Sequence, residues 1–144
     1  MSNEDFRIPL AVDDLPTDTE PLDPSLVYTG TIKTLIKTDK VDKQGGQFLK
    51  GSVTITEPEE WSGKVAFDNY IPLPMEITSD MNDKERRLAK ERGVKLGRLS
   101  ASAKMKGQPH LSEYLDREVQ FTIRNQEYPE GSGRMTSSIQ DYLV

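Results

Sequence analysis

The stretch Val119-Gln-Phe-Thr-Ile-Arg-Asn125 has the strongest alternation of apolar and polar residues in the chain. Successive side chains of a strand point to opposite faces of a sheet. We therefore expect its three apolar residues to face a core and its polar residues to face solvent. A loop with Gly and Pro follows at 126–133, and residues 134–144 provide a further strand pattern. The end of the chain therefore predicts a hairpin of two strands.

Three more strands are predicted nearer the N-terminus. Residues 26–37 are rich in β-branched and aromatic residues, which suit a pleated surface. Residues 47–57 alternate, with Leu49, Gly51, Val53 and Ile55 on one side and Phe48, Lys50, Ser52, Thr54 and Thr56 on the other. Residues 64–73 form the third strand, and the polar residues 38–46 form a long hairpin loop between the first two.

A helical insertion is predicted between the third strand and the C-terminal hairpin. Residues 80–93 indicate an exposed helix, because Asp80 can cap its start, Arg92 lies near its end and its apolar stripe is thin. Residues 96–103 and 111–115 add a short helix and a further turn. The element order is then β-β-β-α-β-β, a mainly β fold.

Charge divides the chain into two parts. Residues 1–24 contain four prolines and have seven acidic side chains against Arg7, a balance of −6, so we expect a tail there and one domain over 25–144. The tail also contains apolar residues that can dock on a partner or on the domain itself: Phe6, Ile8, Leu10, Val12 and Leu15. Residues 84–106 have nine basic side chains against two acidic ones, a balance of +7.

Composition argues against several classes of function. Without cysteine, the chain has no disulfide, thiolate metal site or thiol nucleophile. Its single histidine, His110, adjoins a Gly-Gln-Pro turn and is expected to be an ordinary surface residue. No glycine motif suited to phosphate binding is present. We therefore expect a non-enzymatic protein without metal or cofactor.

The expected location is the cytoplasm. No apolar run approaches the ~18 residues that a membrane-spanning helix requires. The N-terminus, Met1-Ser-Asn-Glu-Asp5, also lacks the basic and then apolar pattern of an export signal.

The predicted order is the one found in the OB-fold: three strands, a helical insertion and a two-stranded hairpin. The OB-fold is a partly open five-stranded barrel whose sheet face and long hairpin loops bind oligonucleotides. Two phrases, Tyr114-Leu-Asp-Arg-Glu-Val-Gln-Phe-Thr-Ile123 and Trp61-Ser-Gly-Lys-Val-Ala-Phe-Asp-Asn-Tyr70, resemble the entries to the fourth and third strands of such domains. Together with the acidic tail, residues 26–144 resemble the small phage-type single-stranded DNA-binding proteins. The resemblance implies a part in phage DNA replication or recombination, in the cytoplasm of the host cell.

The acidic segment departs from that family pattern. Bacterial single-stranded DNA-binding proteins have their acidic, partner-recruiting tail at the C-terminus, whereas this chain has its acidic segment at the front and ends within a predicted strand. Recruitment of replication or recombination proteins by the tail is therefore left open, as is assembly into a homo-oligomer.

Single-strand binding needs aromatic planes for the bases and cations for the phosphates. The aromatic candidates are Phe48, Tyr70 and Tyr128, and the basic candidates are Lys37, Lys40, Lys43, Lys50, Arg86, Arg87, Lys90, Arg98, Lys104, Arg124 and Arg134. Phe48 and Tyr128 can instead pack at a rim or form an oligomer contact. The basic run can instead be a solvated face or a docking site for the tail, within one chain or on a neighbouring subunit.

The remaining aromatic residues are expected to be structural. Tyr28, Phe67 and Phe121 are predicted in the core, and Trp61 is predicted to plug one end of the barrel. A function of a different class remains an alternative: a structural or adaptor module, such as a virion component or an inhibitor, that binds protein through the same barrel. Salt-dependent binding of an oligothymidine distinguishes the two.

Overall fold

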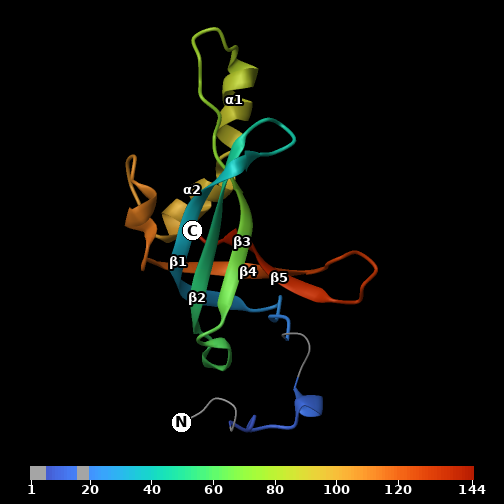
Figure 1. Cartoon of the computed structure of the whole chain (residues 1–144). Helices are drawn as coiled ribbons and strands as arrows, with labels where there is room; N and C mark the ends of the chain where they lie inside the picture. The colour runs from blue at the N-terminus through green and yellow to red at the C-terminus, as the bar shows by residue number, and fades with distance from the viewer. Residues whose placement is uncertain (1–5, 16–19) are drawn as a thin grey trace.

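The structure, a computed structural model, describes residues 6–15 and 20–144 and contains a five-stranded antiparallel sheet (Figure 1). Its strands are β1 (Val27–Val41), β2 (Gln47–Glu57), β3 (Val65–Pro72), β4 (Glu118–Glu127) and β5 (Met135–Tyr142). The order across the sheet is β3-β2-β1-β4-β5. The mainly β class and the predicted order of elements are confirmed.

The sheet is not closed into a barrel, since its hydrogen-bonded order ends at β3 on one side and β5 on the other. Strand β1 pairs with β2 along most of its length and with β4 through Val27–Thr31. Figure 1 shows β4 and β5 running across the direction of β1, β2 and β3. Gly30 of β1 approaches β2 closely, because a Cβ there would lie 2.5 Å from the carbonyl oxygen of Thr54.

Two α-helices lie between β3 and β4: α1 (Asp83–Glu91) and α2 (Val94–Ser102). The described ranges also contain three short 3₁₀ helices: η2 (Val12–Asp14), η3 (Glu59–Trp61) and η4 (Leu111–Tyr114). Figure 1 shows α1 projecting from one end of the molecule, whereas α2 lies against the sheet and buries Leu99. No helix in the described ranges is long and apolar enough to cross a membrane.

The predicted cap of the first helix is wrong by two residues. Asn82, not Asp80, precedes α1, and its side-chain oxygen accepts the N–H of Glu85 at 2.8 Å. The Glu85 carboxylate accepts the N–H of Asn82 at 3.3 Å, which completes a capping box. Asp80 instead accepts the hydroxyl of Thr78, so its carboxylate is already used in the preceding turn.

The core forms between the inward faces of the strands and α2. Leu49, Val53 and Ile55 of β2 are buried, as predicted. The three apolar residues of the β4 alternation are also buried, and the rings of Tyr28 and Phe121 stack with centroids 5.7 Å apart. Trp61 is only half-buried against this core, and the Lys64 ammonium lies 5.0 Å from the centroid of its ring.

Phe67 is not in the core, so that prediction is wrong. Its side chain is 52% exposed, whereas Ala66, Asp68 and Ile71 occupy the inward positions of β3. The pairing of β2 with β3 shifts register between Leu49 and Gly51, so the inward positions of β3 are spaced by two residues and then by three. Phe67 therefore lies on the outer face.

The segment before β1 joins the core at Leu22, which lies within the predicted tail. Its side chain is buried, its N–H donates to the Ser137 hydroxyl at 2.8 Å, and its carbonyl accepts from the Asn125 amide at 2.8 Å. The Tyr28 hydroxyl donates to the carbonyl of Asp23 at 2.8 Å. Of the predicted tail, residues 1–5 and 16–19 lie outside the described residues.

Candidate nucleic-acid interface

The outer face of β1, β2 and β3 presents apolar, aromatic and basic side chains. Directly paired residues of antiparallel strands share a face. The pairs Ile36 with Lys50 and Ser52 with Phe67 therefore lie on the side opposite to buried Leu49. Ile36 and Phe67 are each more than half exposed, and Lys50 is exposed.

Phe48 and Tyr70 meet on this outer face. Their ring centroids are 5.2 Å apart and their planes make an angle of 61°, an edge-to-face contact. Phe48 is half-buried by this contact, while Tyr70 remains 46% exposed. Two residues predicted separately as stacking surfaces therefore form one aromatic pair.

A groove of about 1030 Å³ lies between β3 and the hairpin of β4 and β5. Three exposed aromatic residues line it, Phe67, Tyr70 and Tyr128, together with Arg124. Tyr128 is 70% exposed although its ring is large and apolar. The structure therefore brings Tyr70, Arg124 and Tyr128, three of the predicted residues, to one concave surface.

A buried ionic cluster forms the floor of this groove. Asp68 is 2% exposed, and its two carboxylate oxygens accept the Lys95 ammonium and the Tyr142 hydroxyl, each at 2.9 Å. The Lys95 ammonium also donates to the carbonyl of Ile139 at 3.2 Å. These bonds join α2, β3 and β5 across the open seam of the sheet.

The protonation of this cluster follows from burial and charge. Burial raises the pKa of the Asp68 carboxyl, and the opposing effect comes mainly from the Lys95 charge. Burial and the neighbouring Asp68 charge raise the pKa of the Tyr142 hydroxyl far above its usual range. Tyr142 therefore stays protonated and acts as a hydrogen-bond donor.

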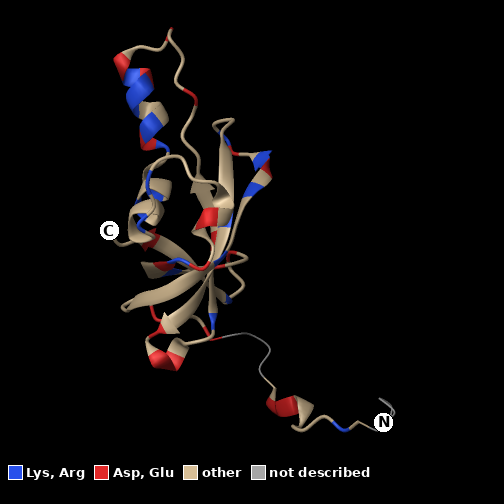
Figure 2. Ribbon diagram, turned by 90° about the vertical axis from the view of Figure 1, so that its left-hand side faces the viewer, with Lys and Arg blue, Asp and Glu red and all other residues tan. Residues whose placement is uncertain are grey.

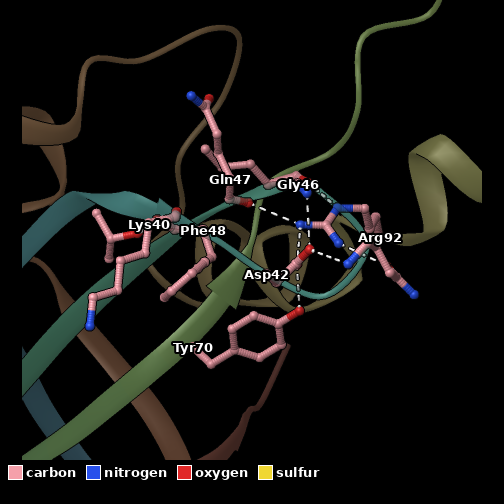
Figure 3. A network of polar contacts seen from close by, with 10 residues as sticks. Lys40, Asp42, Gly46, Gln47, Phe48, Tyr70 and Arg92 are labelled. Atoms are coloured by element: carbon pink, nitrogen blue, oxygen red, sulfur yellow. Dashed lines mark hydrogen bonds and ion pairs between the residues drawn. The ribbon is translucent and has the colours of Figure 1, made fainter.

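A second polar network supports the edge of the aromatic face (Figure 3). Asp42, in the turn between β1 and β2, accepts the N–H groups of Gln44 and Gly46 at 2.9 Å. It also accepts the Tyr70 hydroxyl at 2.8 Å and pairs with the Arg92 guanidinium at 2.6 Å. Tyr70 is thus held by Phe48 through its ring and by Asp42 through its hydroxyl.

Arg92 connects α1 to this turn. Its guanidinium donates to the carbonyls of Leu73 and Gln47 at 2.9 and 3.0 Å, and to the Gln44 side chain at 2.8 Å. A Cβ at Gly46 would lie 2.3 Å from the Arg92 guanidinium, so a side chain there would displace Arg92 from its present position. Burial alone raises the pKa of Asp42, but the bonds from Tyr70, Gly46 and Arg92 lower it well below its usual value.

The other basic candidates lie on several elements around these features. Figure 2 shows Lys and Arg concentrated on α1 and on the hairpin of β1 and β2, which are the locations of Arg86, Arg87, Lys90, Lys37, Lys40 and Lys43. Arg86 donates to the carbonyls of Met81 and Ser79, and Arg87 lies 3.8 Å from Glu91. Arg98 pairs with Asp141.

Arg98, Lys104 and Arg134 are exposed but are not among the residues that line the groove.

No protein-family model matches this chain, and no curated protein sequence matches it.

Sequence reasoning missed three parts of this surface. It predicted Phe67 in the core, and it treated Arg92 and Lys95 as part of an undivided basic run. The signal for Lys95 was an aspartate inside an apolar strand, since a buried carboxylate needs a cationic partner. No local signal indicated that Arg92 pairs with Asp42, because the two residues lie in different elements.

Proposed function

We propose that this protein binds single-stranded DNA without sequence preference, as an OB-fold-like, partly open barrel. The observation that carries the proposal is the groove between β3 and the β4–β5 hairpin, in which Phe67, Tyr70 and Tyr128 are exposed beside Arg124. An exposed aromatic ring need not leave the protein core to stack on a base, and each stacked base contributes roughly 1–3 kcal/mol of binding free energy.

The aromatic pair on the outer face extends this binding surface. Phe48 and Tyr70 lie beside Lys50, and the hairpin beyond them contains Lys37, Lys40 and Lys43. Cations along such a path neutralise phosphates and release counterions, which makes binding depend on salt. The resemblance to phage-type proteins supports a part in replication or recombination of phage DNA in the host cytoplasm.

Tyr128→Ala tests the groove directly. We expect this variant to lose about 1–3 kcal/mol of binding to a fluorescent oligothymidine, because a stacking plane is removed from an exposed position. Tyr128→Phe is the matched control, since it keeps the ring and removes only the hydroxyl. Fluorescence anisotropy at several salt concentrations gives the affinity and the salt slope.

The same titration with duplex DNA tests the preference for unpaired bases. We expect much weaker binding to duplex, because its bases are already stacked on one another. Equal affinity for both forms would exclude binding by base stacking, and absence of any salt-dependent binding would favour the adaptor alternative.

A further inference from the structure

A second groove lies beside α1 and adjoins the aromatic one, because Tyr70 and Pro72 line both. It encloses about 600 Å³, and its apolar lining comes from Pro72, Met75, Met81, Leu88 and Ala89. Leu88 is 51% exposed although it lies on the groove side of α1. Two acidic side chains, Glu85 and Glu91, also line it.

The walls of this α1 groove are already fixed in the structure. Arg92, at the end of α1, donates to the carbonyl of Leu73 and pairs with Asp42. The N–H of Met75 donates to the carbonyl of Ala89 at 3.2 Å. Helix α1 is thus joined to both the β3 extension and the β1–β2 hairpin, so a ligand finds a preformed site.

Residues 6–15 have the features of an occupant for this site. Phe6, Ile8, Leu10 and Val12 are each more than half exposed, and Leu15 is 42% exposed. Phe6, Ile8 and Leu10 precede η2 and alternate along the chain, so an extended segment directs these three to one side. An exposed apolar row of this kind marks a surface that binds a partner.

The charges of the segment also complement the α1 groove. Arg7 alternates with the apolar row, so in an extended segment it points to the other side, and its charge complements the exposed carboxylates of Glu85 and Glu91. Asp13 and Asp14 follow the row and match the outer, basic side of α1, which contains Lys84, Arg87 and Lys90.

The lengths are compatible with this arrangement. Residues 6–11, which precede η2, span about 17 Å when extended, at ~3.3 Å per residue. The nine residues of α1 span about 13 Å, at ~1.5 Å per residue. The two carboxylates therefore pass the end of the groove and reach the basic side of the helix.

The positions of the two features favour binding between copies. Figures 1 and 2 both show residues 6–15 at the end of the molecule away from α1. The chain enters the body at Leu22, which is bonded to Ser137 and Asn125 on the β4–β5 hairpin. We propose that residues 6–15 of one copy occupy the α1 groove of a second copy, so that the protein self-associates by exchange of its N-terminal arms.

The absence of cysteine from the sequence allows a clean cross-linking test. Leu10→Cys and Leu88→Cys are made as separate proteins, mixed in equal amounts and treated with a short bismaleimide. The linked product that contains one of each is expected to exceed the control by about tenfold or more, because docking raises the effective concentration of the two thiols. The control replaces Leu88→Cys with Gly97→Cys, an exposed position on α2 with open space around it.

Each other outcome of this experiment overturns the proposal. A yield equal to that of the Gly97→Cys control means that the arm does not enter the groove. A Leu10→Cys/Leu88→Cys double variant that links within one chain at high dilution means that the arm enters its own groove. Because these readouts use no DNA, they are independent of the proposed single-strand binding.

Light scattering provides a second measurement. The full chain is expected to show a mass that rises above 16.3 kDa with concentration. Leu88→Asp and deletion of residues 1–15 are each expected to give a constant monomer mass, with an unchanged circular dichroism spectrum because Leu88 is exposed. A full chain that remains monomeric, or a Leu88→Asp variant that still associates, contradicts the exchange of arms.

Discussion

At the scale of single residues, Arg92 and Lys95 differ from the other cations of the 84–106 run because each is largely covered in an ion pair with an aspartate. The Arg92 side chain is 8% exposed beside Asp42, and Lys95 is 23% exposed beside Asp68. Removing one partner of such a pair leaves an uncompensated charge, so these residues support the fold under the binding surface. They are poor choices for testing contacts with DNA.

Asp42 gives a pH-dependent prediction. Its pKa in the folded protein lies below the ordinary value of 3.8, so it stabilises the fold above that pH, and this contribution is lost as the pH falls through the folded-state pKa. Asp42→Asn removes the charge that attracts Arg92 and is expected to lower the free energy of unfolding at pH 7. The difference from the parent is expected to shrink at acid pH.

Urea unfolding at pH 7, 4 and 2.5 measures this difference. Asp39→Asn is the matched control, because Asp39 is an exposed carboxylate on the same hairpin. A loss at Asp42→Asn that stays constant from neutral to acid pH would show that its charge is not what stabilises the turn.

At the scale of elements, β2 and β3 show what the sequence can and cannot predict. The bounds of strand β2 agree with prediction, and Leu49, Val53 and Ile55 are buried as expected, but Ser52, predicted on the outward face, is buried as well. Strand β3 contains a register shift, so Phe67 faces outward while the small Ala66 and the polar Asp68 face inward. A register shift is set by the partner strand and leaves no two-residue period in the sequence.

The same limit applies to the candidate site. Alternation in β2 predicted the outward direction of Phe48 and Lys50, but it could not show that Phe48 meets Tyr70 or that Tyr70 bonds to Asp42. These contacts join residues from three elements. Their formation depends on strand pairing and on the turn at Gly46, which no single segment of sequence contains.

Three neighbouring substitutions in β2 separate stacking, charge and packing. Phe48→Ala is expected to cost about 1–3 kcal/mol of oligothymidine binding, because it removes an outward ring. Lys50→Ala is expected to weaken binding mildly and to reduce the salt slope by at most about one unit, because one phosphate contact is lost. Leu49→Ala is the packing control and is expected to cost ~2–5 kcal/mol of stability.

Chemical unfolding and salt-dependent anisotropy of all three variants check this series. Phe48→Ala is also expected to lower the stability somewhat, because it removes the edge-to-face contact with Tyr70. The loss is expected to be smaller than for Leu49→Ala, because the Leu49 side chain is only 1% exposed in the parent protein. If Phe48→Ala unfolds the protein and Leu49→Ala does not, Phe48 faces the core, and the proposed binding face of β2 is wrong.

At the scale of the whole molecule, the basic run of α1 and the acidic 3₁₀ helix η2 lie at opposite ends (Figure 2). Figure 2 shows Lys and Arg on α1 and the β1–β2 hairpin, and acidic residues at η2, which contains Asp13 and Asp14. An acidic segment tethered to a protein with basic surfaces competes with phosphate for those surfaces, most strongly at low salt. Truncation can test this competition only if it leaves the buried Leu22 in place.

Deletion of residues 1–19 is therefore the sharper experiment. It removes five acidic side chains and one arginine, a change of +4, and keeps Leu22. The truncated protein is expected to bind oligothymidine more tightly than the parent at low salt, with the two affinities converging as salt is added, because screening weakens the competition. An Asp13→Asn/Asp14→Asn variant keeps the apolar row and is expected to show a smaller change in the same direction. Weaker binding after deletion would instead mean that the segment assists DNA binding, either by contact or by holding copies of the protein together on the strand.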